Sequence, residues 1–252
     1  LLYFIGAQHN VHPTYVQNLL SDNRYGPDEI VGAIDYLSKA DASSYDGRVL
    51  EKALKMNQVE SAASGSLDLK NRFAQKEVLI IGRGSSVQRY LPAIENYINT
   101  YKPIVLAINL NPIIAESLVD GYVISHNVKF LADKNHYTEK TKPFILPKHR
   151  FGTEEMAAFQ LNAPLWDYGL QVQEGAFAVG DTHCTIPSEL TAAYAIAAAI
   201  NAGASSIKLV GFDGYDKGDK RQEEMVNFLM ALHDQHPEAP LVALTPTTYP
   251  LK

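Results

Sequence analysis

Short apolar runs separated by stretches of helical periodicity dominate the chain from residue 77 to its end. The runs have the length of β-strands, and most are continuous rather than alternating, as expected of strands covered on both faces. They lie at 78–81, 104–108, 122–124, 144–146, 176–179, 207–210 and 241–244. The helical stretches lie at 87–97, 112–118, 187–201 and 221–233. This order predicts an α/β fold with a mostly parallel sheet and flanking helices.

The first 60 residues have a different pattern, which predicts a small helical segment. Their apolar residues recur at helical spacing in short stripes separated by turns. Such helices bury too little surface for a core of their own, so we expect them to pack onto a neighbouring body. A small, polar run at 61–66 is typical of a linker. The chain is therefore expected to comprise a helical segment (1–60), a linker (61–76) and an α/β domain (77–252).

A glycine-rich turn follows the first apolar run of that domain. Gly82 and Gly84 precede Ser85, Ser86 and an amphipathic stretch, which is the order of a strand, a tight turn and a helix start. Glycines let the backbone approach a ligand closely, and hydroxyls and free amides at a helix start favour anions. We therefore expect a Rossmann-like edge that binds a phosphorylated small molecule. A tight turn with a capped helix and no ligand explains the same residues.

The turn does not identify a cofactor. It lacks the third glycine of a dinucleotide fingerprint and the lysine of a Walker loop. No acidic residue follows the second apolar run at the position that would take a ribose. Both differences disfavour a dinucleotide-dependent oxidoreductase. The cofactor stays open, and a nucleotide or nucleotide-sugar with Mg²⁺ is the expectation.

Polar residues also follow other apolar runs, where ligands bind in open α/β sheets. Asn109 follows the run 104–108 and is placed either to read a base or ribose or to cap a helix. Asp213 follows the run 207–210. The tail 244–250 could add hydroxyls to the same cleft, or it could simply end an edge strand. These side chains extend the candidate site beyond the glycine turn.

The loop 180–185 is the best catalytic candidate by composition, since it combines a carboxylate, an imidazole, a thiol and two hydroxyls. We expect His183 to act as general acid or base, because imidazole titrates near neutral pH. Asp181 would orient it or would share a divalent metal with Asp213. A structural role for His183 is the alternative. Cys184 is expected to be a packing residue rather than a nucleophile.

Composition narrows the classes of partner and compartment. The net charge of −6 and a pI near 5.7 argue against nucleic acid, because no basic surplus exists to neutralise phosphates. A single cysteine excludes an internal disulfide and suits a reducing cytoplasm. No apolar run reaches the ~18 residues of a membrane span. His9 and His12 supply only two metal ligands, too few for a zinc site.

Residues 3–20, followed by 28–45, resemble the segment after the barrel in aldolases of the hydroxymethylglutaryl-CoA lyase and 4-hydroxy-2-oxovalerate aldolase superfamily. Those aldolases carry their metal ligands and catalytic residues inside a (β/α)8 barrel, so none of these residues can be assigned here. The chain also starts inside an apolar segment, at Leu1, without Met. The resemblance implies that a barrel domain precedes Leu1 in a longer polypeptide. Homo-oligomerisation stays open.

Residues 78–251 resemble a Rossmann-like group that includes bacterial sialyltransferases and archaeal-type hydroxymethylpterin diphosphokinases. The turn from Gly82 to Ser86 is similar to their Gly-x-Gly-Pro-Ser turn, which holds nucleotide phosphate or ribose, although Ser85 stands where Pro is usual. Asn109 matches the position of their nucleotide-reading Asn. The segment 189–213 is similar to their late helix–strand unit, which ends in Gly-x-Asp. The resemblance implies nucleotide binding more strongly than transfer, because no catalytic base matches.

These expectations combine into one functional hypothesis and its alternatives. The chain would be the C-terminal part of an aldolase-like polypeptide, with a Rossmann-like domain that binds a nucleotide or nucleotide-sugar in carbohydrate biosynthesis. Asp181, His183 and Asp213 would surround the reacting end. One alternative is a glycosyl- or diphospho-transferase acting by itself, and another is a non-catalytic assembly or regulatory module of the aldolase. Fold alone does not separate these.

Overall fold

A computed structural model of the chain describes residues 64–126, 130, 136–151, 156, 161–215, 219–239 and 241–251. Internal contacts divide the chain into two compact units. The first unit comprises 1–61, 126–139 and 150–160, and the second comprises 62–125, 140–149 and 161–252. The expected helical segment 1–60 and the pair His9 and His12 lie outside the described residues.

An aromatic cluster is the main described feature of the first unit. The ring of Phe130 stacks on Tyr137 at 5.6 Å between centroids and is tilted against Phe151 at 4.6 Å. All three side chains are buried. Aromatic packing therefore holds these parts of the first unit together.

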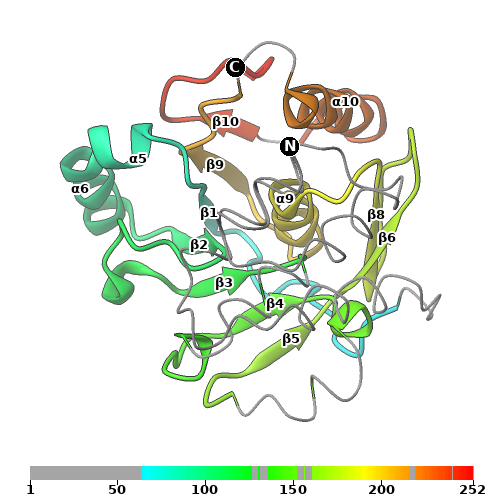
Figure 1. Cartoon of the computed structure of the whole chain (residues 1–252), viewed down its shortest axis with the longest axis horizontal. Coiled ribbons are helices and arrows are strands. Elements are labelled where there is room, and N and C mark those ends of the chain that lie inside the picture. The colour runs from blue at the N-terminus through cyan, green and yellow to red at the C-terminus, as the bar shows by residue number, and fades with distance from the viewer. Residues whose placement is uncertain are drawn as a thin grey trace, which may run out of the picture. The chain divides into compact units, whose positions relative to one another are not determined.

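The second unit is built on a parallel sheet of seven strands in the order β10-β9-β1-β2-β3-β4-β5 (Figure 1). Its strands are β1 (Glu77–Ile81), β2 (Ile104–Ile108), β3 (Gly121–Val123), β4 (Phe144–Leu146), β5 (Leu165–Asp167), β9 (Ser206–Val210) and β10 (Leu241–Ala243). All neighbouring strands are parallel. This sheet confirms the predicted α/β, Rossmann-like fold. Its edge strand β5 was not predicted.

Helices cover both faces of the sheet. The helix α9 (Thr191–Asn201) is rich in alanine and packs on β1, β2 and β3. It belongs to the core cluster that contains Val78 and Ile80, the residues of β1 that point to one face. Figure 1 shows α6 (Leu91–Tyr101) on the other side of β1 and β2, and α6 buries Ile94 and Ile98. The long helix α10 (Lys220–Gln235) follows β9 and adds to the α9 face.

A second, smaller sheet packs against α9. It contains β6 (Gly169–Val172), β8 (His183–Ile186) and β7 (Ala178–Val179), with β8 in the middle. The strand β8 is parallel to β6 and antiparallel to β7. The sequence expectation was wrong on two points. The apolar run 176–179 does supply a strand, β7, but in the small sheet instead of the main one, and residues 183–185 form a strand instead of a loop.

Two predicted helices are also different in the structure. The stretch 87–97 is split into α5 (Ser86–Arg89) and α6, with a break at Tyr90. Pro92 lies in the first turn of α6, and because proline has no N–H it cannot bond back into α5. The stretch 112–118 forms only the 3-10 turn η1 (Glu116–Leu118), since Asn111 holds the preceding backbone in a local turn through Ile113 N–H. A second 3-10 turn, η2, spans Lys148–Phe151.

The segment 64–76, expected to be a linker, is packed against the sheets. Leu69 and Phe73 are fully or almost fully buried in the core. The amide of Gly65 donates to the carbonyl of Thr182, and a Cβ on Gly65 would overlap the carbonyl of Asp167. This stretch is therefore a structural part of the second unit.

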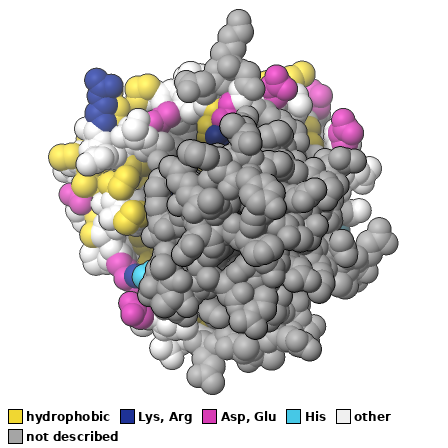
Figure 2. Space-filling view, viewed as in Figure 1, with side chains coloured by type: hydrophobic (Ala, Val, Ile, Leu, Met, Phe, Trp, Pro, Cys, Tyr) yellow, Lys and Arg dark blue, Asp and Glu magenta, His cyan; other side chains and the backbone are white. Residues whose placement is uncertain are grey.

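Part of the surface of the second unit is hydrophobic. Figure 2 shows hydrophobic side chains gathered on the side of α5 and α6. Tyr90, which precedes α6, and Tyr101, its last residue, are exposed. No helix in the described part of the chain has both the length and the apolar character that crossing a membrane requires.

Candidate ligand site at the carboxyl edge

The strand order places a topological switch point between β1 and β9. From β1 the chain continues to β2, β3, β4 and β5 on one side, whereas β9 is followed by β10 on the other side (Figure 1). The loops after β1 and β9 therefore diverge where their strands end. Ligands of open α/β sheets bind in such a crevice. The glycine turn and Asp213 follow these two strands, so the structure brings these predicted site residues together.

The glycines of the turn are required by the neighbouring loop. The amide of Gly82 donates to the carbonyl of Val210 at 2.7 Å, and the amide of Gly84 donates to that of Gly211 at 2.9 Å. A Cβ on Gly82 would lie 2.6 Å from the Gly211 carbonyl oxygen, and one on Gly84 would lie 2.6 Å from the Asp213 carboxyl carbon. The absence of side chains lets two backbone turns touch. Close packing of the protein itself thus explains both glycines.

Asp213 occupies the position where an anion was expected. Its carboxylate accepts hydrogen bonds from the amide of Ser86 at 2.9 Å, from the hydroxyl of Ser85 at 3.2 Å and from the hydroxyl of Ser86. Ser85 stands at the N-cap but makes no side-chain cap. The helix α5 has a single turn of four residues, so it offers little dipole for a phosphate. The described donors of Ser85 and Ser86 are therefore bonded to the protein's own carboxylate, and the amides of Gly82 and Gly84 are bonded to backbone carbonyls.

Threonines after β10 complete the edge around Asp213. Thr245 Oγ1 accepts a hydrogen bond from the amide of Gly211 at 3.0 Å and lies 3.2 Å from the hydroxyl oxygen of Ser86, within hydrogen-bond distance. The amide of Thr248 donates to the carbonyl of Asp213 at 2.9 Å. The tail 244–250 therefore contributes a hydroxyl to this edge, where it bonds to the protein itself.

Asn109 has the most unusual surroundings of the predicted site residues. It follows β2 with a left-handed backbone (φ 54°) and is only 2% exposed. Its amide N–H donates to the carbonyl of Val123, but its side-chain Oδ1 finds no hydrogen-bond partner in the described structure. A buried acceptor without a donor is costly and is rare in native proteins. Asn109 therefore has a buried hydrogen-bond acceptor for which the described residues supply no donor.

Asn111 is a residue of this edge that sequence reasoning missed. Its side-chain amide donates to the carbonyl of Gly82 at 2.7 Å and so ties the loop after β2 to the glycine turn. Its Oδ1 accepts from Ile113 N–H. The Asn-x-Asn spacing was the available signal, because an asparagine that follows a strand end by three residues can reach the neighbouring loop.

Asp181 and His183 are not joined to this edge. His183 begins β8 in the small sheet, where it pairs in register with Gly169. The Asp181 side chain is 75% exposed, and its partner is Lys70 at 3.8 Å. No hydrogen bond or ion pair among the described residues connects either side chain to Asp213 or the glycine turn. The structure thus provides no contact for the expected catalytic trio.

Cys184 is completely buried in β8, and burial raises the pKa of its thiol well above the ordinary value. A protonated, buried thiol is unsuited to nucleophilic attack, in agreement with the packing role expected for it. Within the described ranges, no three His, Cys, Asp or Glu side chains come together as metal ligands.

Comparisons with known proteins add no relative to this picture. No protein-family model matches the chain, and no curated protein matches it at a significant level. The function must therefore be inferred from the geometry of the edge itself.

Proposed function

We propose that the second unit binds a nucleotide or nucleotide-sugar at the carboxyl edge, and that it contacts the nucleoside or sugar part there. The observation that carries this proposal is that Oδ1 of Asn109 has no hydrogen-bond partner in the described structure. It lies at the end of β2, beside the switch point, and it needs an N–H or O–H donor. Base amines and sugar hydroxyls supply such donors, whereas a fully ionised phosphate supplies none.

Asp213 favours the same part of the ligand. A carboxylate repels phosphate but accepts hydrogen bonds from hydroxyls. Ser85 donates one of the bonds to Asp213 and is exposed. A sugar hydroxyl can replace the Ser85 hydroxyl at the carboxylate without breaking the bonds made by Ser86. The phosphates of the ligand would then point away from the glycine turn.

The proposal extends to the longer polypeptide. The resemblance of 3–20 and 28–45 to the post-barrel segment of aldolases supports a role beside an aldolase barrel in carbohydrate biosynthesis. The resemblance of 78–251 to nucleotide-binding transferases and diphosphokinases agrees with the ligand class. Binding is the activity that the described contacts support, since they assemble no catalytic group at Asp213.

The test is thermal stabilisation of the chain by nucleosides, nucleotides and nucleotide-sugars, each with and without Mg²⁺. A ligand specific for the folded state at a hundred times its Kd stabilises by about 2.7 kcal/mol. We expect stabilisation by one nucleotide family, with the nucleoside itself binding measurably. Asn109→Gly should weaken that binding roughly tenfold or more, because it removes the acceptor and keeps the left-handed backbone available.

Asn71→Gly is the matched control. Asn71 also has a left-handed backbone (φ 63°) but lies before β1, in the segment 64–76. Equal affinity of the two glycine variants would contradict the role of Asn109. If no compound stabilises the chain, the assembly or regulatory role becomes the better hypothesis, and the chemistry belongs to the barrel.

A further inference from the structure

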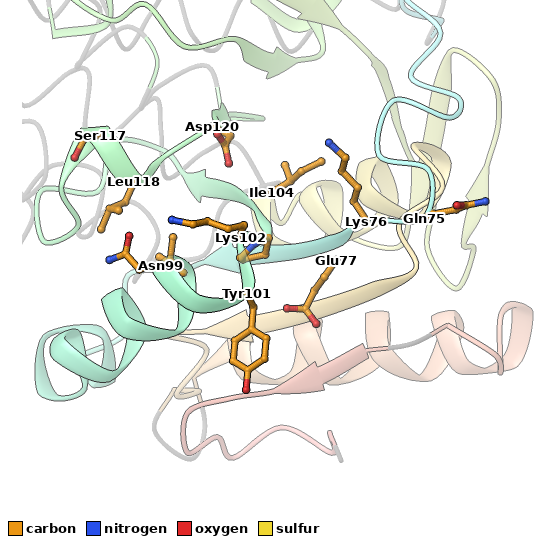
Figure 3. Close-up of a pocket in the computed structure, with 12 residues that line it drawn as sticks. Gln75, Lys76, Glu77, Asn99, Tyr101, Lys102, Ile104, Ser117, Leu118 and Asp120 are labelled. Carbon is orange, nitrogen blue, oxygen red and sulfur yellow. The ribbon is translucent and has the colours of Figure 1, made fainter.

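A groove of about 620 Å³ opens at the amino edge of the same sheet, opposite the carboxyl edge (Figure 3). It lies between the C-terminal end of α6 and the residues at the starts of β1, β2 and β3. Lys76 and Lys102 line it from two neighbouring chain segments, just before β1 and β2. Since Val78 pairs with Ile104, these lysines occupy corresponding positions ahead of adjacent strands.

Several donor side chains of the groove have no partner among the described residues, whereas each of its two carboxylates accepts a hydrogen bond. The side chains of Lys76, Asn99, Lys102 and Ser117 form no hydrogen bond or ion pair with the residues that the structure describes. Glu77 accepts a hydrogen bond from the hydroxyl of Tyr97. Asp120 Oδ2 accepts one from the amide of Val105 at 2.9 Å. The groove therefore holds two ammonium groups and two further polar side chains without a described partner, beside two carboxylates that each accept a hydrogen bond and keep their charge.

Backbone strain is also concentrated at this groove. Of the described non-glycine residues with positive φ, two are asparagines, which tolerate this conformation, and the other two are Gln75 (φ 60°) and Lys102 (φ 52°). Both line the groove. Lys102 ends α6 by donating its amide to the carbonyl of Ile98, at a position where glycine is usual. A lysine held where glycine is more stable indicates that its side chain is used.

We propose that this groove binds a small molecule that carries a phosphate group. Lys76 and Lys102 would supply the positive charge, and Asn99 and Ser117 would supply further hydrogen bonds to the phosphate oxygens. Figure 3 shows Lys102 extending toward Asn99 and Leu118, whereas Tyr101 and Glu77 point to the other side. The site is separate from the carboxyl edge, so it does not depend on the function proposed above.

Isothermal titration of the whole chain with inorganic pyrophosphate, and with orthophosphate in a second arm, tests the proposal at low ionic strength. We expect saturable binding of one pyrophosphate. Lys102→Gly removes the charge and relieves the backbone strain, so this variant should be at least as thermally stable as the parent chain. Its affinity should nevertheless fall roughly tenfold, and Lys76→Gln should have a similar effect.

Two control variants separate the groove from general surface charge. Gln75→Gly relieves the same kind of strain without removing a charge, and it should keep the parent affinity. Lys70→Gln removes a lysine outside the groove, and it should also bind as the parent does. Absence of saturable binding, or equal affinity in Lys102→Gly and Gln75→Gly, overturns the proposal. Binding that both lysine variants keep and Ser86→Ala loses assigns the anion to the carboxyl edge and overturns it as well.

Discussion

At the carboxyl edge of the parallel sheet, Ser85 and Ser86 donate to the carboxylate of Asp213, and the unpaired group is a buried acceptor, Asn109 Oδ1. At the amino edge the relation is reversed. Glu77 and Asp120 each accept a hydrogen bond from the protein, and Lys76 and Lys102 have no partner among the residues that the structure describes. One sheet thus offers an acceptor at one end and donors at the other.

This difference changes where a phosphate is expected. Sequence motifs direct attention to the glycine turn, because glycine and serine before a helix are typical of phosphate sites. In the structure the carboxylate of Asp213 accepts hydrogen bonds at that turn, and the helix that follows the turn, α5, has a single turn. Two lysines without a partner among the described residues, Lys76 and Lys102, lie at the other edge. Hydrogen-bond partners, rather than the motif, therefore decide which edge suits which part of a ligand.

The largest expected effect is the loss of stability when a side chain is added at Gly211, where the loops after β1 and β9 touch. Gly211 has a left-handed backbone (φ 73°), and a Cβ there would overlap Val87. We expect Gly211→Ala to destabilise the fold by about 3 kcal/mol, from backbone strain together with overpacking. Denaturation by urea measures the change in the free energy of unfolding.

Gly175→Ala is the control for this prediction. Gly175 has nearly the same φ (70°), but a Cβ there would meet nothing within 4 Å. Its cost should be about 1 kcal/mol, from the backbone alone. Equal losses of stability in the two alanine variants would show that the close approach of the β1 and β9 loops is unimportant.

A somewhat smaller effect is expected from removing the carboxylate that fills the turn. Asp213→Ala leaves the amide and hydroxyl of the buried Ser86 without their charged acceptor. The unfolding free energy should fall by about 2 kcal/mol. Asp213→Asn keeps one acceptor oxygen and should lose about half as much. If Asp213→Ala is as stable as the parent chain, the bonds from Ser86 to the carboxylate do not stabilise the turn. The proposed difference between the two edges of the sheet would then be contradicted.

The continuous apolar runs predicted the main sheet well, and the reason is physical. The strands β1, β2 and β4 are buried on both faces, so their sequences contain almost nothing but apolar residues. The strands β5 (Leu-Trp-Asp) and β8 (His-Cys-Thr-Ile) carry polar residues, since β5 lies at an edge and β8 belongs to a small sheet. Period and hydrophobicity do not distinguish such segments from loops.

The candidate site was predicted only in part for a different reason. Strand ends can be identified along the sequence, which is why Gly82, Ser86, Asn109 and Asp213 were all considered together. The bond between Ser86 and Asp213 joins residues 127 positions apart. A local sequence pattern does not show whether a polar group forms a hydrogen bond with a residue so far away along the chain. The same holds for the open donors of the amino edge, which have no motif at all.

The smallest predicted effect is a pH-dependent change in stability at the start of α10, the helix that follows β9. Asp219 caps α10 by accepting from the amide of Arg221 at 2.9 Å, and its carboxylate also binds the Arg221 guanidinium. The hydrogen bond from Arg221 lowers the pKa of Asp219 below its ordinary value of 3.8. A lowered pKa in the folded state means that the cap stabilises fully above that ordinary value and is lost as the pH falls through the lower one.

Asp219→Ala should therefore destabilise the chain by about 1 kcal/mol at neutral pH, and the difference from the parent should shrink in acid. Urea denaturation at a series of pH values from neutral to below 3.8 measures it. Asp219→Asn separates cap from charge, because asparagine caps nearly as well but carries no charge to pair with Arg221. Because neither variant has the titrating carboxylate, the smaller loss in Asp219→Asn should shrink in acid by the same amount as the loss in Asp219→Ala. A parent–alanine difference that stays constant into acid would show that the charged form of Asp219 contributes nothing to this end of the carboxyl edge.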